Sequence, residues 1–253
     1  MKAFLRKEWM ELYRSGRFLI LLLIFTLFGI MNPAVAKLTP WLMETLTDSL
    51  AESGLTVTEV TVDAMNSWGQ FYKNIPAGIV VFILLCSSSF TGEYQKGTLI
   101  PPVTKGLSRR KILLAKALTM FVLWTVMYWL CFGITCGYNG YFWDNGIAGH
   151  LFFAGMLTWL FGVWVTALMI CFSSAAGSST QVLLGTGGVV MGVYILGMFP
   201  KISGFLPVKL MDGMSLLQGI KAPGDYAVGM AAAGGTILLC MVLAAVCFDR
   251  KQL

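Results

Sequence analysis

The residues best suited to interact chemically with another molecule lie in a polar loop, residues 92–116, between two long apolar segments. The loop carries six of the chain's eighteen lysines and arginines but only one carboxylate, Glu93. Glu93 and Gly97 are four residues apart, so they share one face if this part is helical. Gly97 allows a close approach or ends a helical turn, and Thr98 can cap the segment after it. These residues favour a surface that receives another molecule over a catalytic centre.

The second half of the loop contains the signals that end one helix and begin the next. Pro101 and Pro102 stop a short helix, and Ser108 is placed to cap the helix that starts at the basic run after it. A plainer interpretation is a well-capped loop that only sets membrane topology. Spacing alone leaves the two interpretations open.

The rest of the sequence offers little catalytic chemistry. The centres of the apolar segments contain no Asp, Glu, Lys, Arg or His, the groups with which proton-coupled carriers and intramembrane proteases work. The single histidine, His150, is predicted to have an interfacial role. The sequence contains no GxxxxGK[ST] pattern, so it lacks a P-loop for nucleotide phosphates. The six cysteines lack CxxC spacing and are interpreted as packing residues, with no metal or disulfide framework.

The elements that position this loop are membrane helices. Apolar residues make up 57% of the chain and charged residues only 12%, which is typical of an integral membrane protein. Ahead of the first apolar segment, four apolar residues share one helical arc, which predicts an amphipathic helix at the membrane interface. These residues are Leu5, Trp9, Leu12 and Tyr13. An ordinary charged leader is the alternative, and a cleaved signal peptide is disfavoured by two acids in this stretch.

We therefore predict an all-α membrane protein with a single transmembrane domain, residues 1–253, and six spans of about 20 residues each. The predicted parts are an interfacial helix at 1–17, spans at 18–36, 75–91, 112–138, 147–172, 181–199 and 227–248, an extracellular loop at 37–74, a cytoplasmic loop at 92–111, and a broken, re-entrant extracellular segment at 200–226.

The charge distribution predicts which side each loop faces. With both termini in the cytoplasm, the inner segments hold thirteen of the eighteen basic residues and all six arginines, as the positive-inside rule requires. The net charge of +6 is thereby explained without nucleic acid as a partner. The outer loop 37–74 carries acids spaced four apart, which form either a solvated helix face or an attractant for a cationic peptide. These acids are Glu44, Asp48, Glu52, Glu59 and Asp63.

The run EYQKGTLIPPVTKGLSRRKILLAKAL resembles the loop between the second and third helices of type-2 ABC exporter permeases. The matching positions are Glu93, Gly97, Thr98, Leu99, Gly106, Leu107, Ser108, Arg109, Ile112 and Lys116. The paired prolines depart from the family, which usually has apolar helical residues there. In overall organisation, the resemblance extends over nearly the whole chain.

The resemblance implies a transport subunit that is not itself an enzyme. It implies a coupling helix in the cytoplasmic loop, docked into a cytoplasmic ABC ATPase that is present in two copies and binds ATP-Mg, so this chain needs no cofactor. It also implies a second permease, identical or different, in the cell membrane. Small residues at GxxxG spacing, Gly133 with Gly137 and Gly188 with Gly192, could pack such a pair. The residues assigned to ATPase coupling are Glu93, Tyr94, Gly97, Thr98, Leu99, Leu107, Ser108 and Arg109.

The uncharged spans favour an amphipathic or lipophilic substrate, such as an antimicrobial peptide, an antibiotic or a lipid-like molecule. Two other functions remain open: a stand-alone membrane scaffold or enzyme that needs no ATPase, and a permease for an ion-linked process. The sequence identifies neither the substrate residues nor the ATPase partner.

Overall fold

The computed structural model describes residues 2–52, 62–95, 97–98 and 108–251, with the single positions 104 and 106. Every element in this part of the chain is a helix, which confirms the predicted all-α class. The long helices are α1 (Lys2–Arg14), α2 (Arg17–Glu52), α3 (Ala64–Cys86), α4 (Ser88–Gln95), α6 (Arg109–Phe142), α7 (Leu151–Ala175), α8 (Ser179–Gly197) and α11 (Ala227–Arg250). The short ones are η1 (Asn145–Ile147), α9 (Pro200–Ser203), η2 (Pro207–Met211), α10 (Gly213–Leu217) and η3 (Pro223–Tyr226).

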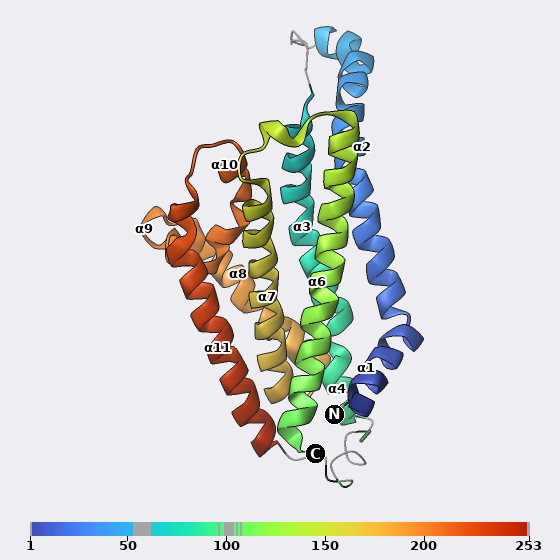
Figure 1. Ribbon diagram of the computed structural model, residues 1–253, viewed down its shortest axis with the longest axis vertical. Helices are drawn as coiled ribbons and strands as arrows, with labels where there is room; N and C mark the ends of the chain where they lie inside the picture. Colours follow the sequence, from blue (N-terminus) through green and yellow to red (C-terminus); the bar gives the residue numbers. More distant parts are fainter. Residues whose placement is uncertain are drawn as a thin grey trace.

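Six helical stretches are long and apolar enough to cross a membrane, as the sequence predicts. They are Arg17–Leu42, Ala64–Gln95, Arg109–Phe142, Leu151–Ala175, Ser179–Gly197 and Pro223–Arg250. Most of them stand side by side in an elongated bundle, and α8 crosses obliquely behind (Figure 1). Both termini lie at the lower end of this view, together with α1 and α4. We call this the terminal end of the bundle.

The centre of the bundle is formed by α6 and α7, which pack closely because small residues face large aromatic ones. A Cβ atom on Gly162 of α7 would lie 1.9 Å from Cζ2 of Trp124 on α6, so no larger residue fits there. The Trp124 indole also donates a hydrogen bond to the carbonyl of Trp159 (3.1 Å), and the Tyr128 hydroxyl donates one to that of Gly155 (2.8 Å). Small residues bring membrane helices close, and buried polar tips need such partners.

Much of the predicted loop 37–74 is helical. The first span continues as α2 to Glu52, and α3 begins at Ala64, where the Asp63 carboxylate accepts hydrogen bonds from two backbone amides of the first turn. Polar residues in the first turns of α3 interrupt the apolar pattern, which is why the sequence placed the span at Ile75. Residue Glu59 and the side chains of Glu44, Asp48 and Glu52 lie outside the described part of the structure.

The segment 200–226 consists of short helices that pack against α7 and α11. Two hydrogen bonds hold it: the Tyr226 hydroxyl donates to the carbonyl of Asp212 (2.8 Å), and the Gly149 amide donates to that of Leu217 (3.1 Å). No helix here has the length of a span, in agreement with the sequence. Its re-entrant placement in the membrane remains a prediction.

Candidate functional site

A short helix at the terminal end, α4, connects most of the bundle. It follows α3 after Ser87 and contains Glu93 and Tyr94, two residues that the sequence assigned to coupling. At its first residue, the Ser88 hydroxyl accepts a hydrogen bond from Arg17 at the start of α2 (2.9 Å). At its last residue, the Gln95 amide reaches the carbonyl of Gly177 between α7 and α8 (3.5 Å).

At α4, side chains from three helices form a buried charge cluster: Lys7 and Glu8 of α1, Glu93 of α4, and Lys116 of α6. Lys116 Nζ lies 2.9 Å from Glu8 Oε2 and 2.9 Å from Glu93 Oε2. Lys7 Nζ contacts Glu93 Oε1 and lies 3.2 Å from Glu8 Oε1. Each carboxylate therefore lies between two ammonium groups, and α1, α4 and α6 are joined by charge.

Three of the four charged groups in the cluster are shielded from solvent. Lys116 is fully buried, and only 3% of Glu8 and 4% of Glu93 is exposed. Removing charges from water costs several kcal/mol per ion, so these three buried groups are tolerated only because they are paired. The pairing has a measurable consequence at Lys7, which is half-buried. Burial lowers the pKa of Lys7. Its hydrogen bond to Glu93 and the nearby carboxylates raise the pKa by more than burial lowers it, so the pKa lies above its ordinary value.

The carboxylates of Glu8, Glu11 and Glu93 lie close enough together to be considered as a metal site. The ammonium groups of Lys7 and Lys116 already neutralise them, and Glu11 Oε2 itself lies 3.2 Å from Lys7 Nζ. The chemistry of this group of residues is therefore structural ion pairing, which links helices.

The E-x-x-x-G-T pattern forms the C-terminal cap of α4. The Thr98 amide donates to the carbonyl of Glu93 (3.1 Å), and the Gly97 amide donates to that of Tyr94 (3.2 Å). These two bonds define a Schellman motif, in which the residue after the helix adopts a left-handed conformation. Gly97 has φ +64, which glycine adopts without strain. The Thr98 hydroxyl also points back to the carbonyl of Glu93 (3.5 Å).

The C-terminal end of α11 packs onto the same region. The Tyr94 ring lies 6.2 Å from that of Phe248, and Lys251 Nζ lies over the Tyr94 ring at 3.9 Å from its centroid. Arg109, the first residue of α6, donates to the carbonyls of Asp249 (3.1 Å) and Lys251. A guanidinium on the last carbonyls of a helix satisfies acceptors that lack an intrahelical partner.

The predicted coupling residues therefore have different environments. Glu93 is buried, Tyr94 and Arg109 are partly buried against α11, and Thr98 and Ser108 are exposed. Ser108 takes the N-cap position of α6, as predicted, but its hydroxyl makes no capping bond. Leu99 and Leu107, like the two prolines between them, lie outside the described residues.

Sequence reasoning missed Lys7 and Glu8 as members of the site. It assigned an apolar arc to α1, yet the buried face of this helix runs through Phe4, Glu8 and Leu12, and Tyr13 is 60% exposed. One signal was available, because Glu8 and Leu12 are four residues apart and so share a helical face. The partner of that acid, Lys116, was already part of the family pattern.

The fold and this site define a multi-pass helical membrane protein whose only concentration of paired charge lies, within the described residues, at the terminal end. A profile of the family described as "ABC-2 family transporter protein" matches residues 3–222. The chain belongs to this family of transport permeases. Membership implies a membrane setting and an ABC ATPase as partner, and the chain is a transport subunit that is not an enzyme itself. No match was found among curated proteins or among solved structures.

Proposed function

We propose that this chain is the transmembrane subunit of an ATP-driven exporter, in which two permeases assemble with two separate cytoplasmic ATPase subunits. The observation that carries this proposal is the position of α4. Its inner side is joined by charge to α1 and α6, whereas Thr98, just after it, is exposed. A force applied at the exposed side would reach several spans at once.

The ATPases would dock at the terminal end, which is then cytoplasmic. All six arginines belong to helix segments at this end, in accord with the positive-inside rule. The sequence has no P-loop, so ATP-Mg would be bound by the partner, and its closure would supply the force. Glu93 then acts as a positioning residue, because it is buried and cannot itself contact the ATPase.

The substrate would be amphipathic or lipophilic, in the class of antimicrobial peptides, antibiotics or lipid-like molecules. An apolar groove of about 250 Å³ between α3 and α8 supports an apolar path; its lining includes Ile79, Ile83, Phe161 and Val190. It contains no charged side chain, which fits cargo taken from the bilayer.

Co-purification tests the proposal. The tagged chain is coexpressed with the ABC ATPase encoded nearest to its gene, purified, and reconstituted in nanodiscs for ATPase measurement. We expect the ATPase to copurify and to hydrolyse ATP. Replacing exposed Thr98 or Ser108 by arginine should abolish copurification without changing the melting temperature. Lys201→Gln, beyond the far end of α8, is the matched control. If every candidate ATPase fails to bind while the chain remains active alone, the function is that of a stand-alone scaffold or enzyme.

A further inference from the structure

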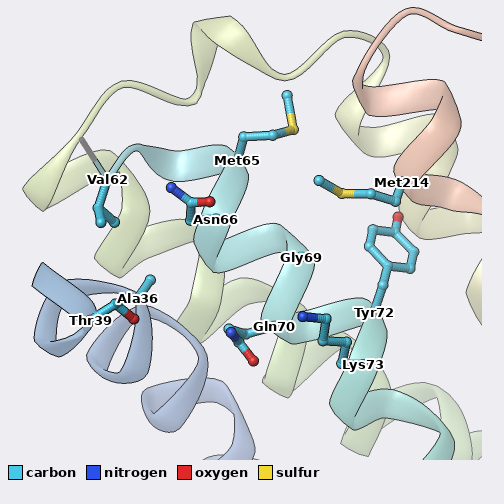
Figure 2. Close-up of a pocket in the computed structure, with 10 residues that line it drawn as sticks. All are labelled: Ala36, Thr39, Val62, Met65, Asn66, Gly69, Gln70, Tyr72, Lys73 and Met214. Atoms are coloured by element: carbon cyan, nitrogen blue, oxygen red, sulfur yellow. The ribbon is translucent and has the colours of Figure 1, made fainter. Parts of the chain in front are cut away.

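A cavity of about 470 Å³ with a mixed polar and apolar lining lies between α2 and α3, at the end of these helices away from the termini. Figure 2 shows three polar side chains of α3, Asn66, Gln70 and Lys73, on the side of α3 that faces this cavity, with Thr39 of α2 opposite. Met214 of α10 and Ala36 of α2 supply apolar lining. The volume is within the range of small-molecule sites, and the mixed lining suits a molecule with both polar and apolar parts.

Among the described residues, three polar side chains of this cavity are available for a ligand. The side chains of Asn66, Gln70 and Lys73 make no hydrogen bond or ion pair with other described residues. The Thr39 hydroxyl already donates to the carbonyl of Val35 (2.8 Å). The cavity thus offers one ammonium and two amides, and no described carboxylate lines it. Such a set favours an anion, because an ammonium and amide N–H groups all donate to its oxygens.

The frame that holds the cavity is fixed by a chain of polar contacts. The Asn74 amide donates to Oδ1 of Asn32 (2.8 Å), and the Asn32 amide donates to the hydroxyl of Thr135 (3.1 Å). Asn32 and Thr135 are fully buried. Asn74 directly follows Lys73, so these bonds hold α3 against α2 and α6 beside the cavity. The cavity is therefore present before any ligand binds. A preformed site loses less freedom on binding.

The place of the cavity along α3 points to an amphipathic ligand. The candidate span Ala64–Gln95 joins α3, which has 23 residues, to α4 at the terminal end, and its apolar run begins only at Ile75. The first turns of α3 can therefore reach the headgroup level while later turns stay in the acyl region. An anionic group at Lys73 could then leave its apolar tail in the bilayer beside α2, whose Leu27 and Ile30, nearer the middle of the span, are exposed.

From these contacts we infer that the cavity between α2 and α3 binds the anionic head group of an amphipathic molecule, with Lys73 as counter-ion and Gln70 and Asn66 as hydrogen-bonding groups. The inference rests on the proposed export function for its meaning as a substrate site, and it narrows the cargo to anionic amphiphiles. Binding to the cavity needs no ATPase, so the binding site and the proposed export function can fail separately.

The test uses the purified full-length chain in a neutral detergent and follows its melting temperature. Short-chain phosphatidylglycerol is the anionic probe, phosphatidylcholine of the same chain length is the zwitterionic control, and inorganic phosphate tests a free anion. We expect the melting temperature to rise, and to reach saturation, with phosphatidylglycerol only. Lys73→Gln should weaken this binding roughly tenfold, the size of one lost charge-assisted hydrogen bond. Lys201→Gln makes the same charge change outside the cavity and should bind as the unaltered chain does.

A second variant keeps the cationic group and fills the space. A Cβ on Gly69 would contact only Met214 Cε, at 3.8 Å, so Gly69→Leu projects into the cavity without a clash near the backbone. It should weaken phosphatidylglycerol binding even if Lys73→Gln does not fold. Equal binding of phosphatidylcholine, equal binding of free phosphate, or undiminished binding by both variants would overturn the inference. If the probe binds as expected but no ATPase copurifies, the site stands and the export function fails.

Discussion

At the scale of single residues, Glu93 has a role different from the one its place in an exposed-looking loop indicates. A carboxylate in a basic loop is expected to face solvent or a partner protein. Here its two oxygens face Lys7 and Lys116 from different helices, and almost none of its surface is exposed. The residue therefore joins helices of this chain, and under the proposed function contact with the ATPase would fall to its exposed neighbours.

Removing this carboxylate should destabilise the protein. Glu93→Gln leaves buried ammonium groups with fewer partners, and breaking a buried ion pair costs about 3–5 kcal/mol. Thermal unfolding in detergent measures the loss. Adding Lys116→Met to the Glu93→Gln variant should lower the free energy of unfolding much less than Lys116→Met does in the unaltered chain, because the two residues share one interaction. Additive effects would show that they do not interact.

Glu11→Gln is the matched control. Its carboxylate pairs with the same Lys7 but is 43% exposed, so the expected loss is below about 1 kcal/mol. A loss as large as that of Glu93→Gln would mean that burial is not what makes the cluster important.

Gly97 should be sensitive to substitution because of its left-handed backbone. Gly97→Ala introduces a Cβ at φ +64 and should destabilise the cap by about 1–2 kcal/mol. Gly92→Ala, in the same short helix, meets nothing within 4 Å and should be neutral or stabilising. Thermal unfolding of the two variants compares them directly. Equal melting temperatures would contradict the Schellman assignment.

At the scale of elements, α4 is small, yet it contacts α1, α2, α6, α7, α8 and α11. Helices of this length are not stable alone in water, so α4 owes its structure to these contacts. An element formed in this way moves together with its neighbours or unfolds.

The hydrogen bonds from Arg109 to the C-terminal end of α11 can be tested separately. Arg109→Ala removes the donors to the last carbonyls of α11, and we expect faster amide hydrogen exchange over residues 245–251. Arg110→Ala is the control, because that side chain is 75% exposed and its pair with Asp249 contributes little. Unchanged exchange in Arg109→Ala would show that α11 is held by packing alone.

At the scale of the whole molecule, the hydropathy and charge patterns predicted the class of fold and the number of spans. Six apolar stretches need six crossings, whatever their packing. The start of α3 could not be predicted, because Asn66, Gln70 and Lys73 read as loop residues when their cavity is unknown. The charge cluster could not be predicted either, since it joins residues 7, 8, 93 and 116, which only the tertiary fold brings together.

The orientation of the bundle yields a prediction for intact cells. In a cysteine-free background, a cysteine replacing Ser108 should react with a membrane-impermeant maleimide only after the cells are opened, whereas one replacing Lys201 should react at once. The expected asymmetry follows from the arginines at the terminal end. Reaction of the Ser108 position in intact cells would place both termini outside and exclude docking of a cytoplasmic ATPase there.

The buried charge cluster also constrains how this sequence can evolve. A neutral residue at position 93 would leave Lys116 with Glu8 as its only carboxylate, and a neutral residue at 116 would leave two buried acids with Lys7 alone. Related sequences should therefore lose or replace the charged residues at these positions together, because a sequence with only one of them changed is less stable. An alignment of related sequences in which positions 8, 93 and 116 vary independently would show that selection does not treat them as one unit.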